Sequence, residues 1–208
     1  MRQLAITIIT LFLLNSVSLN PVYSALNGRL EYQIPIDYSQ LSENELNLKA
    51  EKFFYNALKT NDTNVNDDIT QALMLYNILQ KINPDKVIYY VKSGILYDKI
   101  NLNKYAKSDF SMAIYTNPDI PESYYYFGEY YYKRQMYRKA LKLYLVAYKL
   151  NMKSNYDLVY KLGDIYQKLG DTKNALKYLQ IEYSQNPSEK LDAKIKLLET
   201  LNATNTEY

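Results

Sequence analysis

Apolar and polar residues follow a helical pattern over most of the chain. From about residue 45 onward, amphipathic stretches alternate with short polar turns. An amphipathic helix is stable only when another element covers its apolar face, so the pattern indicates helices packed on helices. The helices are expected at residues 43–60, 68–82, 86–100, 103–116, 121–135, 137–150, 156–168 and 171–184. A ninth is expected at 188–201, where one apolar stripe beside one charged face suits a helix that caps a stack, followed by a tail at 202–208.

Scarce residues recur at a fixed interval along these helices. Gly94, Gly128 and Gly163 are spaced 34 and 35 residues apart, and a tyrosine follows each glycine three residues later. Alanine recurs at the same interval, and Asn-Pro pairs mark three of the repeat ends; these positions are Ala72, Ala106, Ala140, Ala175, Asn83-Pro84, Asn117-Pro118 and Asn186-Pro187. A period of about 34 residues predicts stacked helix–turn–helix units.

The motif inside each unit resembles that of the tetratricopeptide repeat family, W-x2-L-G-x2-Y followed by A-x3-F and P. The resemblance covers about residues 45–187, with a degenerate first unit, no Trp in any unit and no Pro in the third. The matching segments are Tyr90-x2-Ser93-Gly94-x2-Tyr97 with Ala106-x3-Phe110, Tyr124-x2-Phe127-Gly128-x2-Tyr131 with Ala140-x3-Tyr144, and Val159-x2-Leu162-Gly163-x2-Tyr166 with Ala175-x3-Leu179.

This resemblance implies an all-α fold, a right-handed α-solenoid of about four repeats over residues 43–187 with a concave groove. Gly and Ala are expected where the two helices of a unit cross, because a large side chain there would push the helices apart. Gly128 is therefore expected to tolerate no large residue. Tyr124, Phe127 and Tyr131 are expected to be core positions of the third unit.

The resemblance also implies a set of groove residues. Family members that hold chaperone tails clamp a terminal carboxylate with Lys and Asn, and this chain lacks that clamp. A groove lined by tyrosines and acids is instead expected to accept an apolar or basic segment. For Tyr125 and Tyr132, packing and recognition remain equally open. The positions carried over are Asn47, Glu51, Val91, Ile95, Lys99, Tyr125, Glu129, Tyr132, Lys133, Tyr160, Asp164 and Lys168.

The first 24 residues have the pattern of a secretory signal peptide. A positive charge at Arg2 precedes the apolar run Leu4 to Leu14, and a small residue, Ser24, stands before the expected cut. An uncleaved anchor is the alternative, although this run is shorter than the roughly 20 residues that span a bilayer. We expect cleavage after Ser24, a polar lead-in at 25–42, no membrane span in the mature chain, and export to the periplasm or beyond. The absence of Cys favours a bacterial envelope.

Composition removes most catalytic chemistry. The chain has no Cys and no His, which excludes a thiolate nucleophile, a Ser-His-Asp triad and His-ligated metals. Its 25 basic residues and 22 acidic residues give a formal charge of only +3, which disfavours a nucleic-acid partner. We therefore expect no catalytic residues, no metal and no cofactor.

One segment resembles the start of a calcium loop. Asp62, Asn64 and Asn66 place oxygens at alternate positions, but the sixth and twelfth positions are Asp67 and Leu73 instead of Gly and an acid. The favoured interpretation is an insertion near 61–68 in the turn of the first unit, with Asp67 or Asp68 near a helix N-terminus.

These patterns leave two functions open. The first is a non-enzymatic scaffold of the bacterial envelope that binds a protein or peptide in the solenoid groove. The alternative is a module that binds glycan or peptidoglycan through groove tyrosines and acids.

Overall fold

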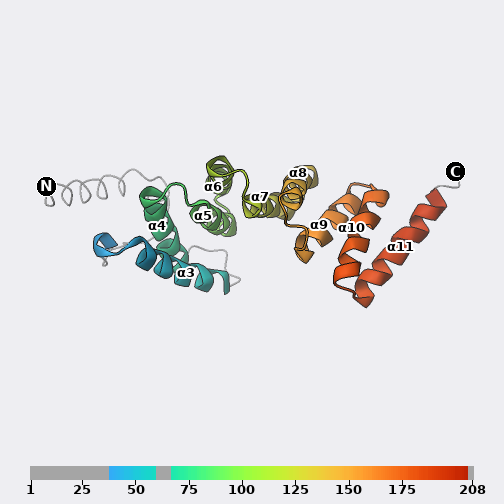
Figure 1. Cartoon of the computed structure of the whole chain (residues 1–208), viewed down its shortest axis with the longest axis horizontal. Coiled ribbons are helices and arrows are strands. Elements are labelled where there is room, and N and C mark those ends of the chain that lie inside the picture. The colour runs from blue at the N-terminus through green and yellow to red at the C-terminus, as the bar shows by residue number, and fades with distance from the viewer. Residues whose placement is uncertain (1–37, 60–66, 206–208) are drawn as a thin grey trace. The chain divides into compact units, whose positions relative to one another are not determined.

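The computed structural model describes residues 38–59 and 67–205, and every regular element within these ranges is a helix (Figure 1). The chain divides into two compact units, Met1–Ile82 and Asn83–Tyr208. The signal-peptide residues, most of the lead-in and the calcium-like positions 62–66 lie outside the described residues.

The first unit is a pair of packed helices. A short 3-10 helix, η1 (Tyr38–Gln40), precedes α3 (Glu43–Lys59), which packs on α4 (Asp67–Ile82). Ser42 and Glu45 form a capping box at the start of α3: the Ser42 N–H donates to Glu45 Oε2 over 2.9 Å, and the Glu45 N–H donates to Ser42 Oγ over 3.4 Å. Asp67 and Asp68 lie in the first turn of α4, which agrees with their interpretation as helix-start residues.

The second unit contains three helix pairs and a final helix. The pairs are α5 (Val87–Lys99) with α6 (Asn103–Thr116), α7 (Pro121–Lys133) with α8 (Tyr137–Lys149), and α9 (Tyr156–Lys168) with α10 (Thr172–Gln185). The final helix, α11 (Glu189–Asn205), packs on α10. It ends at Asn205 and not at 201, so the first part of the predicted tail continues the helix.

Glycine allows the two helices of each pair to approach closely. A Cβ atom placed on Gly128 would lie 2.4 Å from Tyr144 Cε1, and one on Gly163 would lie 2.7 Å from Leu179 Cδ2. Gly94 faces Phe110 in the same way, at 2.9 Å. The glycines therefore stand at the helix crossings, as predicted, and the large residue of each A-x3-F motif fills the space beside them.

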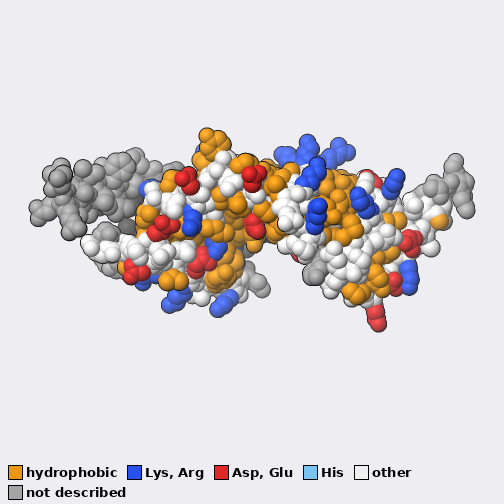
Figure 2. All heavy atoms as spheres, in the orientation of Figure 1, with side chains coloured by type: hydrophobic (Ala, Val, Ile, Leu, Met, Phe, Trp, Pro, Cys, Tyr) orange, Lys and Arg blue, Asp and Glu red, His pale blue; other side chains and the backbone are white. Residues whose placement is uncertain are grey.

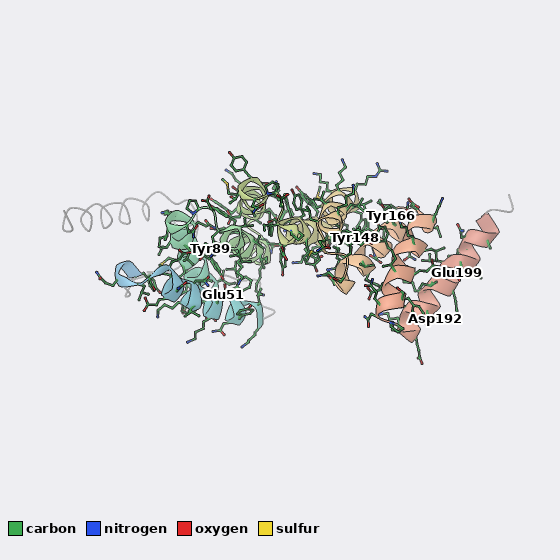
Figure 3. All side chains as sticks on the ribbon, in the orientation of Figure 1. Glu51, Tyr89, Tyr148, Tyr166, Asp192 and Glu199 are labelled. Carbon is green, nitrogen blue, oxygen red and sulfur yellow. The ribbon has the colours of Figure 1, made fainter. Side chains whose placement is uncertain are left out.

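Aromatic side chains join successive pairs. Phe127 of α7 stacks on Phe110 of α6, with ring centroids 5.5 Å apart. Tyr148 of α8 packs on Tyr178 of α10, in the next pair, with ring centroids 5.5 Å apart, and Tyr178 also stacks at 5.6 Å on Tyr166 of α9 within its own pair; Tyr148 and Tyr166 are labelled in Figure 3. These contacts extend one apolar core from pair to pair, as stacked repeats require.

The turns inside the pairs also repeat. Asn101, Gln135 and Gly170 adopt positive φ values of 60°, 56° and 79° just after the first helix of each pair in the second unit. The tyrosine three residues after each crossing glycine accepts a backbone hydrogen bond across this turn: the Met136 N–H, for example, donates to Tyr131 O over 3.0 Å. This left-handed helix ending favours Gly or Asn, and Gly170 meets it without a Cβ penalty.

Within the described part of the chain, no helix is both long and apolar enough to cross a bilayer.

Candidate binding surface on helices α7, α9 and α11

Helices α7 and α9 each present a tyrosine and a carboxylate on one face. Tyr125, Glu129 and Tyr132 follow one another at spacings of four and three residues along α7, so they share a side of the helix. Tyr160, Asp164 and Lys168, at spacings of four and four residues, share a side of α9. The structure connects the two helices and α11 through a tyrosine–carboxylate–lysine network. Its members are Tyr125, Glu129, Tyr132, Tyr144, Asp157, Tyr160, Lys161, Asp164, Lys168 and Lys194.

Lys161 of α9 is the centre of one half of the network. Its Nζ donates to Glu129 Oε1 over 2.6 Å and to Asp157 Oδ2 over 2.7 Å, so one ammonium bridges carboxylates of neighbouring helices. The Tyr125 hydroxyl donates to Asp157, and the Tyr144 hydroxyl donates to Glu129. Because hydrogen bonds to ionised groups are stronger than neutral ones, this half holds its side chains in fixed positions.

Asp164 is the centre of the other half. This side chain is buried, yet the Tyr132 hydroxyl donates to its Oδ2 over 2.6 Å and Lys168 donates to the same oxygen. Lys194, from α11, approaches Oδ1 at 3.3 Å. Burial raises the pKa of Asp164, but hydrogen bonds from Lys168 and Tyr132, with the nearby lysine charges, outweigh it and leave that pKa below its ordinary value. Asp164 is therefore ionised at neutral pH.

Three tyrosines of the network have raised pKa values. Burial raises the pKa values of Tyr125, Tyr132 and Tyr144, and the hydrogen bonds that they donate to carboxylates raise them further. These hydroxyls consequently stay protonated and act as donors throughout the physiological pH range.

Ammonium groups also cover the tyrosine rings. Lys161 Nζ lies 5.6 Å from the ring centroid of Tyr125 and 5.7 Å from that of Tyr132. Lys194 Nζ lies 4.8 Å from the ring centroid of Tyr160. Cation–π attraction adds to the ion pairs in holding these lysines over the surface.

The charge of the network is balanced. Glu129, Asp157 and Asp164 are paired with the three lysines at positions 161, 168 and 194. The expectation of an apolar or basic segment rested on the tyrosines and acids, and the structure pairs those acids with lysines that offset their charge. Net charge therefore gives this surface little preference for a basic segment over a neutral one.

Other predicted groove residues lie outside the network. Val91 is only 1% exposed and packs in a cluster with Val87 and Ala113, so its placement on the groove surface was wrong. Its position follows the helical phase of α5, but neighbouring apolar side chains cover it. Ile95 is half-buried beside that cluster, and Lys99 is half-buried on the same helix.

Lys133 takes part in a separate ion-pair group. Its Nζ donates to Asp98 Oδ2 over 3.0 Å, and Arg134 donates to the other oxygen of Asp98 over 2.6 Å. The Arg134 guanidinium also lies 3.9 Å from the ring centroid of Tyr130. This group ties α7 to α5 and leaves Lys133 engaged within the second unit.

In the first unit, Asn47 is half-buried, and Glu51, labelled in Figure 3, repeats one contact of the network. Glu51 Oε1 accepts a hydrogen bond from the Tyr76 hydroxyl over 3.0 Å, as Glu129 accepts one from Tyr144. Each of these tyrosines ends an Ala-x3-Tyr motif. Where the motif ends in Phe110, the position equivalent to the acid is Ile95.

Sequence reasoning missed Asp157, Lys161 and Lys194. The first two had a signal, because Lys161 follows Asp157 by four residues and such pairs meet on a helix surface. Lys194 had none: it lies on α11, and only packing of that helix brings it to Asp164.

Comparison with known proteins supports the repeat assignment. No protein-family model matches the sequence. The TPR repeat-containing protein MJ1428 of Methanocaldococcus jannaschii is 27% identical over 175 residues, which are 76% of this chain and 30% of that protein. The chain thus spans less than a third of the length of this relative.

Solved structures show the same fold. A crystal structure of MamA superposes with a TM-score of 0.57 at 23% identity, over 65% of this chain and 80% of that one. YrrB, described as a TPR protein with an unusual peptide-binding site, gives 0.57 at 24% identity, over 64% and 68%. The fold is an all-α tetratricopeptide-like solenoid. Together with the repeat-containing relative, these structures support a relationship to the tetratricopeptide repeat family.

Proposed function

We propose that this tetratricopeptide-like chain is a non-enzymatic scaffold that binds a protein or peptide segment on the surface of α7, α9 and α11. The observation that carries the proposal is the network itself, which fixes part-exposed tyrosines and charged groups on α7, α9 and α11. Fixed side chains lose little conformational entropy when a ligand binds. The peptide-binding site named for YrrB, a protein of similar fold, adds support.

The chemistry of the surface suits a peptide backbone. Lysine N–H groups and carboxylate oxygens lie on the same face, so donors and acceptors are both present for the C=O and N–H groups of an extended segment. The tyrosines supply contact area between them, and aromatic residues are common anchors at protein interfaces.

A glycan is the less favoured ligand. Sugars bind by stacking on an open aromatic face, whereas Lys161 lies over the rings of both Tyr125 and Tyr132. We keep purified peptidoglycan as a comparison ligand in the test below.

We further propose that the chain acts in a bacterial envelope after export. The N-terminal pattern ending at Ser24 and the absence of Cys support this location. Mass spectrometry of the chain recovered from the envelope fraction should show an N-terminus at Ala25. An N-terminus at Met1 would contradict cleavage.

The test of the binding surface is the double variant Tyr125→Ala with Tyr160→Ala. Peptides selected from a displayed library against the wild-type chain serve as ligands, and their affinity is measured by titration. We expect affinity for the double variant to fall by more than about tenfold, roughly 1.4 kcal/mol. The matched control is Tyr115→Ala with Tyr183→Ala, which removes two exposed tyrosines from outside the network.

Each outcome is decisive. Unchanged binding with intact helicity would remove the ligand from this surface, and equal losses in the control pair would show non-specific binding through tyrosine. Binding of purified peptidoglycan in place of peptides, lost in the same variant, would favour the glycan alternative. Loss of helical circular dichroism in the double variant would assign both tyrosines to packing.

A further inference from the structure

Basic residues are concentrated in one stretch of a chain whose overall charge is small. Between Glu129 and Asp157 there is no acidic residue, while seven basic residues occur there: Lys133, Arg134, Arg138, Lys139, Lys142, Lys149 and Lys153. The formal charge of the whole chain is +3, so the remainder carries 3 − 7 = −4. The small formal charge of the whole chain thus conceals a strongly basic region centred on α8.

The neighbouring second helices of the pairs extend this region. Helices α6, α8 and α10 carry a set of exposed basic side chains that we call the basic face. Its members are Lys104, Lys107, Arg138, Lys139, Lys142, Lys149, Lys173 and Lys177. Figure 2 shows Lys and Arg side chains gathered over α8 and α10. None of these eight residues forms an ion pair with another residue of the described ranges.

The acidic residues of the same three helices are withdrawn from the surface. Asp109 of α6 is half-buried and accepts a hydrogen bond from Ser93. Glu182 of α10 is only 4% exposed and bonds to Asn186. Within the described residues, α6, α8 and α10 therefore expose positive charge without a compensating acid. The first helices differ, because α7 and α9 carry the charge-balanced network.

The arrangement along each helix directs these charges outward together. Arg138, Lys142 and Lys149 follow at spacings of four and seven residues, which place them on one side of α8. Lys173 and Lys177 repeat the spacing of four on α10. Exposed apolar residues accompany them on α6, where Tyr115 is 84% exposed and Met112 is 43% exposed.

We propose that the basic face docks on an anionic phospholipid membrane surface. Its charges are spread over the second helices of three successive pairs, which matches a continuous layer of phosphate groups better than a single groove would. Seven of the eight are lysines, point charges that bind phosphate without the bidentate geometry of arginine. Tyr115 and Met112 can enter the headgroup region, as amphipathic side chains do at such interfaces.

The N-terminal sequence is consistent with this partner. If the apolar run Leu4 to Leu14 acts as the signal or the anchor that its pattern predicts, it would bring the chain to a membrane. The proposal does not depend on the ligand of the network, since every network residue except the buried Tyr144 of α8 lies on a helix other than those of the basic face. A chain docked in this way would keep α7 and α9 free to bind a second partner.

The experiment is co-sedimentation of the full chain with vesicles of phosphatidylcholine alone and of phosphatidylcholine mixed with phosphatidylglycerol. The test variant reverses three charges on α8: Arg138→Glu, Lys142→Glu and Lys149→Glu. Its matched control reverses three exposed lysines on α3: Lys49→Glu, Lys52→Glu and Lys59→Glu. Both variants change the net charge equally, and Glu and Lys have similar helix propensities. Neutral vesicles report any insertion of the N-terminal apolar run.

The wild-type chain and the α3 control should bind anionic vesicles at least about tenfold more strongly than neutral ones, and salt should weaken the difference. The α8 variant should lose this preference while keeping its helical circular dichroism. Equal binding of all three proteins, or binding that ignores headgroup charge, would overturn the proposal. So would a chain that ignores anionic vesicles but binds a DNA oligonucleotide through the α8 residues, which would make nucleic acid the partner. If the α8 variant fails to fold, Lys142→Gln with Lys149→Gln provides the same comparison with smaller changes.

Discussion

Single residues decide how closely the helices of a pair can approach. The crossing glycines Gly94, Gly128 and Gly163 each face a large residue 16 positions later, and the aromatic or aliphatic side chain there fills the space that a Cβ would need. The closest approach is at Gly128, where the ring of Tyr144 lies directly over the glycine. The Tyr144 hydroxyl also donates a hydrogen bond to Glu129, so this side chain takes part in both core packing and the network.

Gly128→Leu should destabilise the chain by about 1–3 kcal/mol, because the new side chain overlaps the ring of Tyr144. Chemical denaturation measures the loss. Tyr144→Ala removes the overlapping ring, so the double variant should lose less stability than the sum of the two single losses. A Gly128→Leu protein that melts at the wild-type temperature would show that this glycine is not at a tight crossing.

Asp109 should make stability depend on pH. Burial raises the pKa of Asp109 to about 6, although a hydrogen bond from Ser93 opposes the shift. Between about pH 4 and 6 the folded state therefore holds this proton more tightly than the unfolded state does, and stability falls as pH rises through that window. The fall is at most about 3 kcal/mol, since one pKa unit corresponds to about 1.4 kcal/mol.

Asp109→Asn should remove this part of the pH dependence. The variant should gain stability relative to wild type near pH 7 and differ little below about pH 4, where the carboxyl is protonated in both states. Urea unfolding across this range measures both effects. A constant difference between the two proteins at every pH would contradict a buried, ionising Asp109.

At the scale of the helix, the sequence marks some starts by side-chain caps and leaves others uncapped. Asn155 begins α9 by accepting a hydrogen bond from the Leu158 N–H over 2.9 Å, and Asp171 begins α10 by accepting one from the Asn174 N–H over 3.0 Å. Helix α8 follows Met136 and has no side-chain cap, so packing against α7 must stabilise its start. The starts of α9 and α10 are therefore specified more strongly by their own residues than the start of α8 is.

Asn155→Ala and Asp171→Ala should each cost about 1 kcal/mol at neutral pH, because each leaves a backbone N–H of the first turn without its partner. The two should differ in acid. Hydrogen bonds from the side chain and the backbone of Asn174 lower the pKa of Asp171, so its contribution is present above its unfolded pKa and is lost as pH falls through the folded pKa. In urea unfolding, Asp171→Ala should therefore approach wild type toward pH 3, whereas Asn155→Ala should not. An identical acid response would show that the Asp171 carboxylate is not the effective cap.

At the scale of the whole molecule, the repeat places two sets of charged residues on different faces. The first helices α7 and α9 carry the network of balanced charge, and the second helices α6, α8 and α10 carry the basic face. Both sets belong to the second unit. This division allows one small chain to offer two chemically distinct surfaces.

The far-UV circular dichroism spectrum of the chain should be that of an α-helical protein, because every regular element of the described ranges is a helix. The unfolding transition should also become broad when one helix pair is weakened, because each repeat contacts mainly its neighbours. Gly128→Leu is a suitable variant for that measurement. A spectrum dominated by β-structure would contradict the repeat.

The sequence by itself determined the helices, their pairing and the crossings. Scarce Gly, Ala and Asn-Pro residues recur about every 34 residues and mark the same positions in each helix pair. The two helices of a pair are close in the chain, so residues near each other in sequence set their geometry. The phase of each helix also placed Tyr125, Glu129 and Asp164 on related faces. Val91 shares that phase but is buried, because burial depends on which side chains of other helices cover a position.

Only the tertiary structure decided which groups meet. Lys194 reaches Asp164 from 30 residues away, and Lys161 reaches Glu129 from 32, separations at which the spacing rules of a single helix predict no contact. Ion pairing and cation–π contact act through space, so the charge balance of the network became visible only when α7, α9 and α11 were packed together. The basic face has the same origin: the sequence supplies the lysines, and folding hides the two acids that would otherwise stand among them.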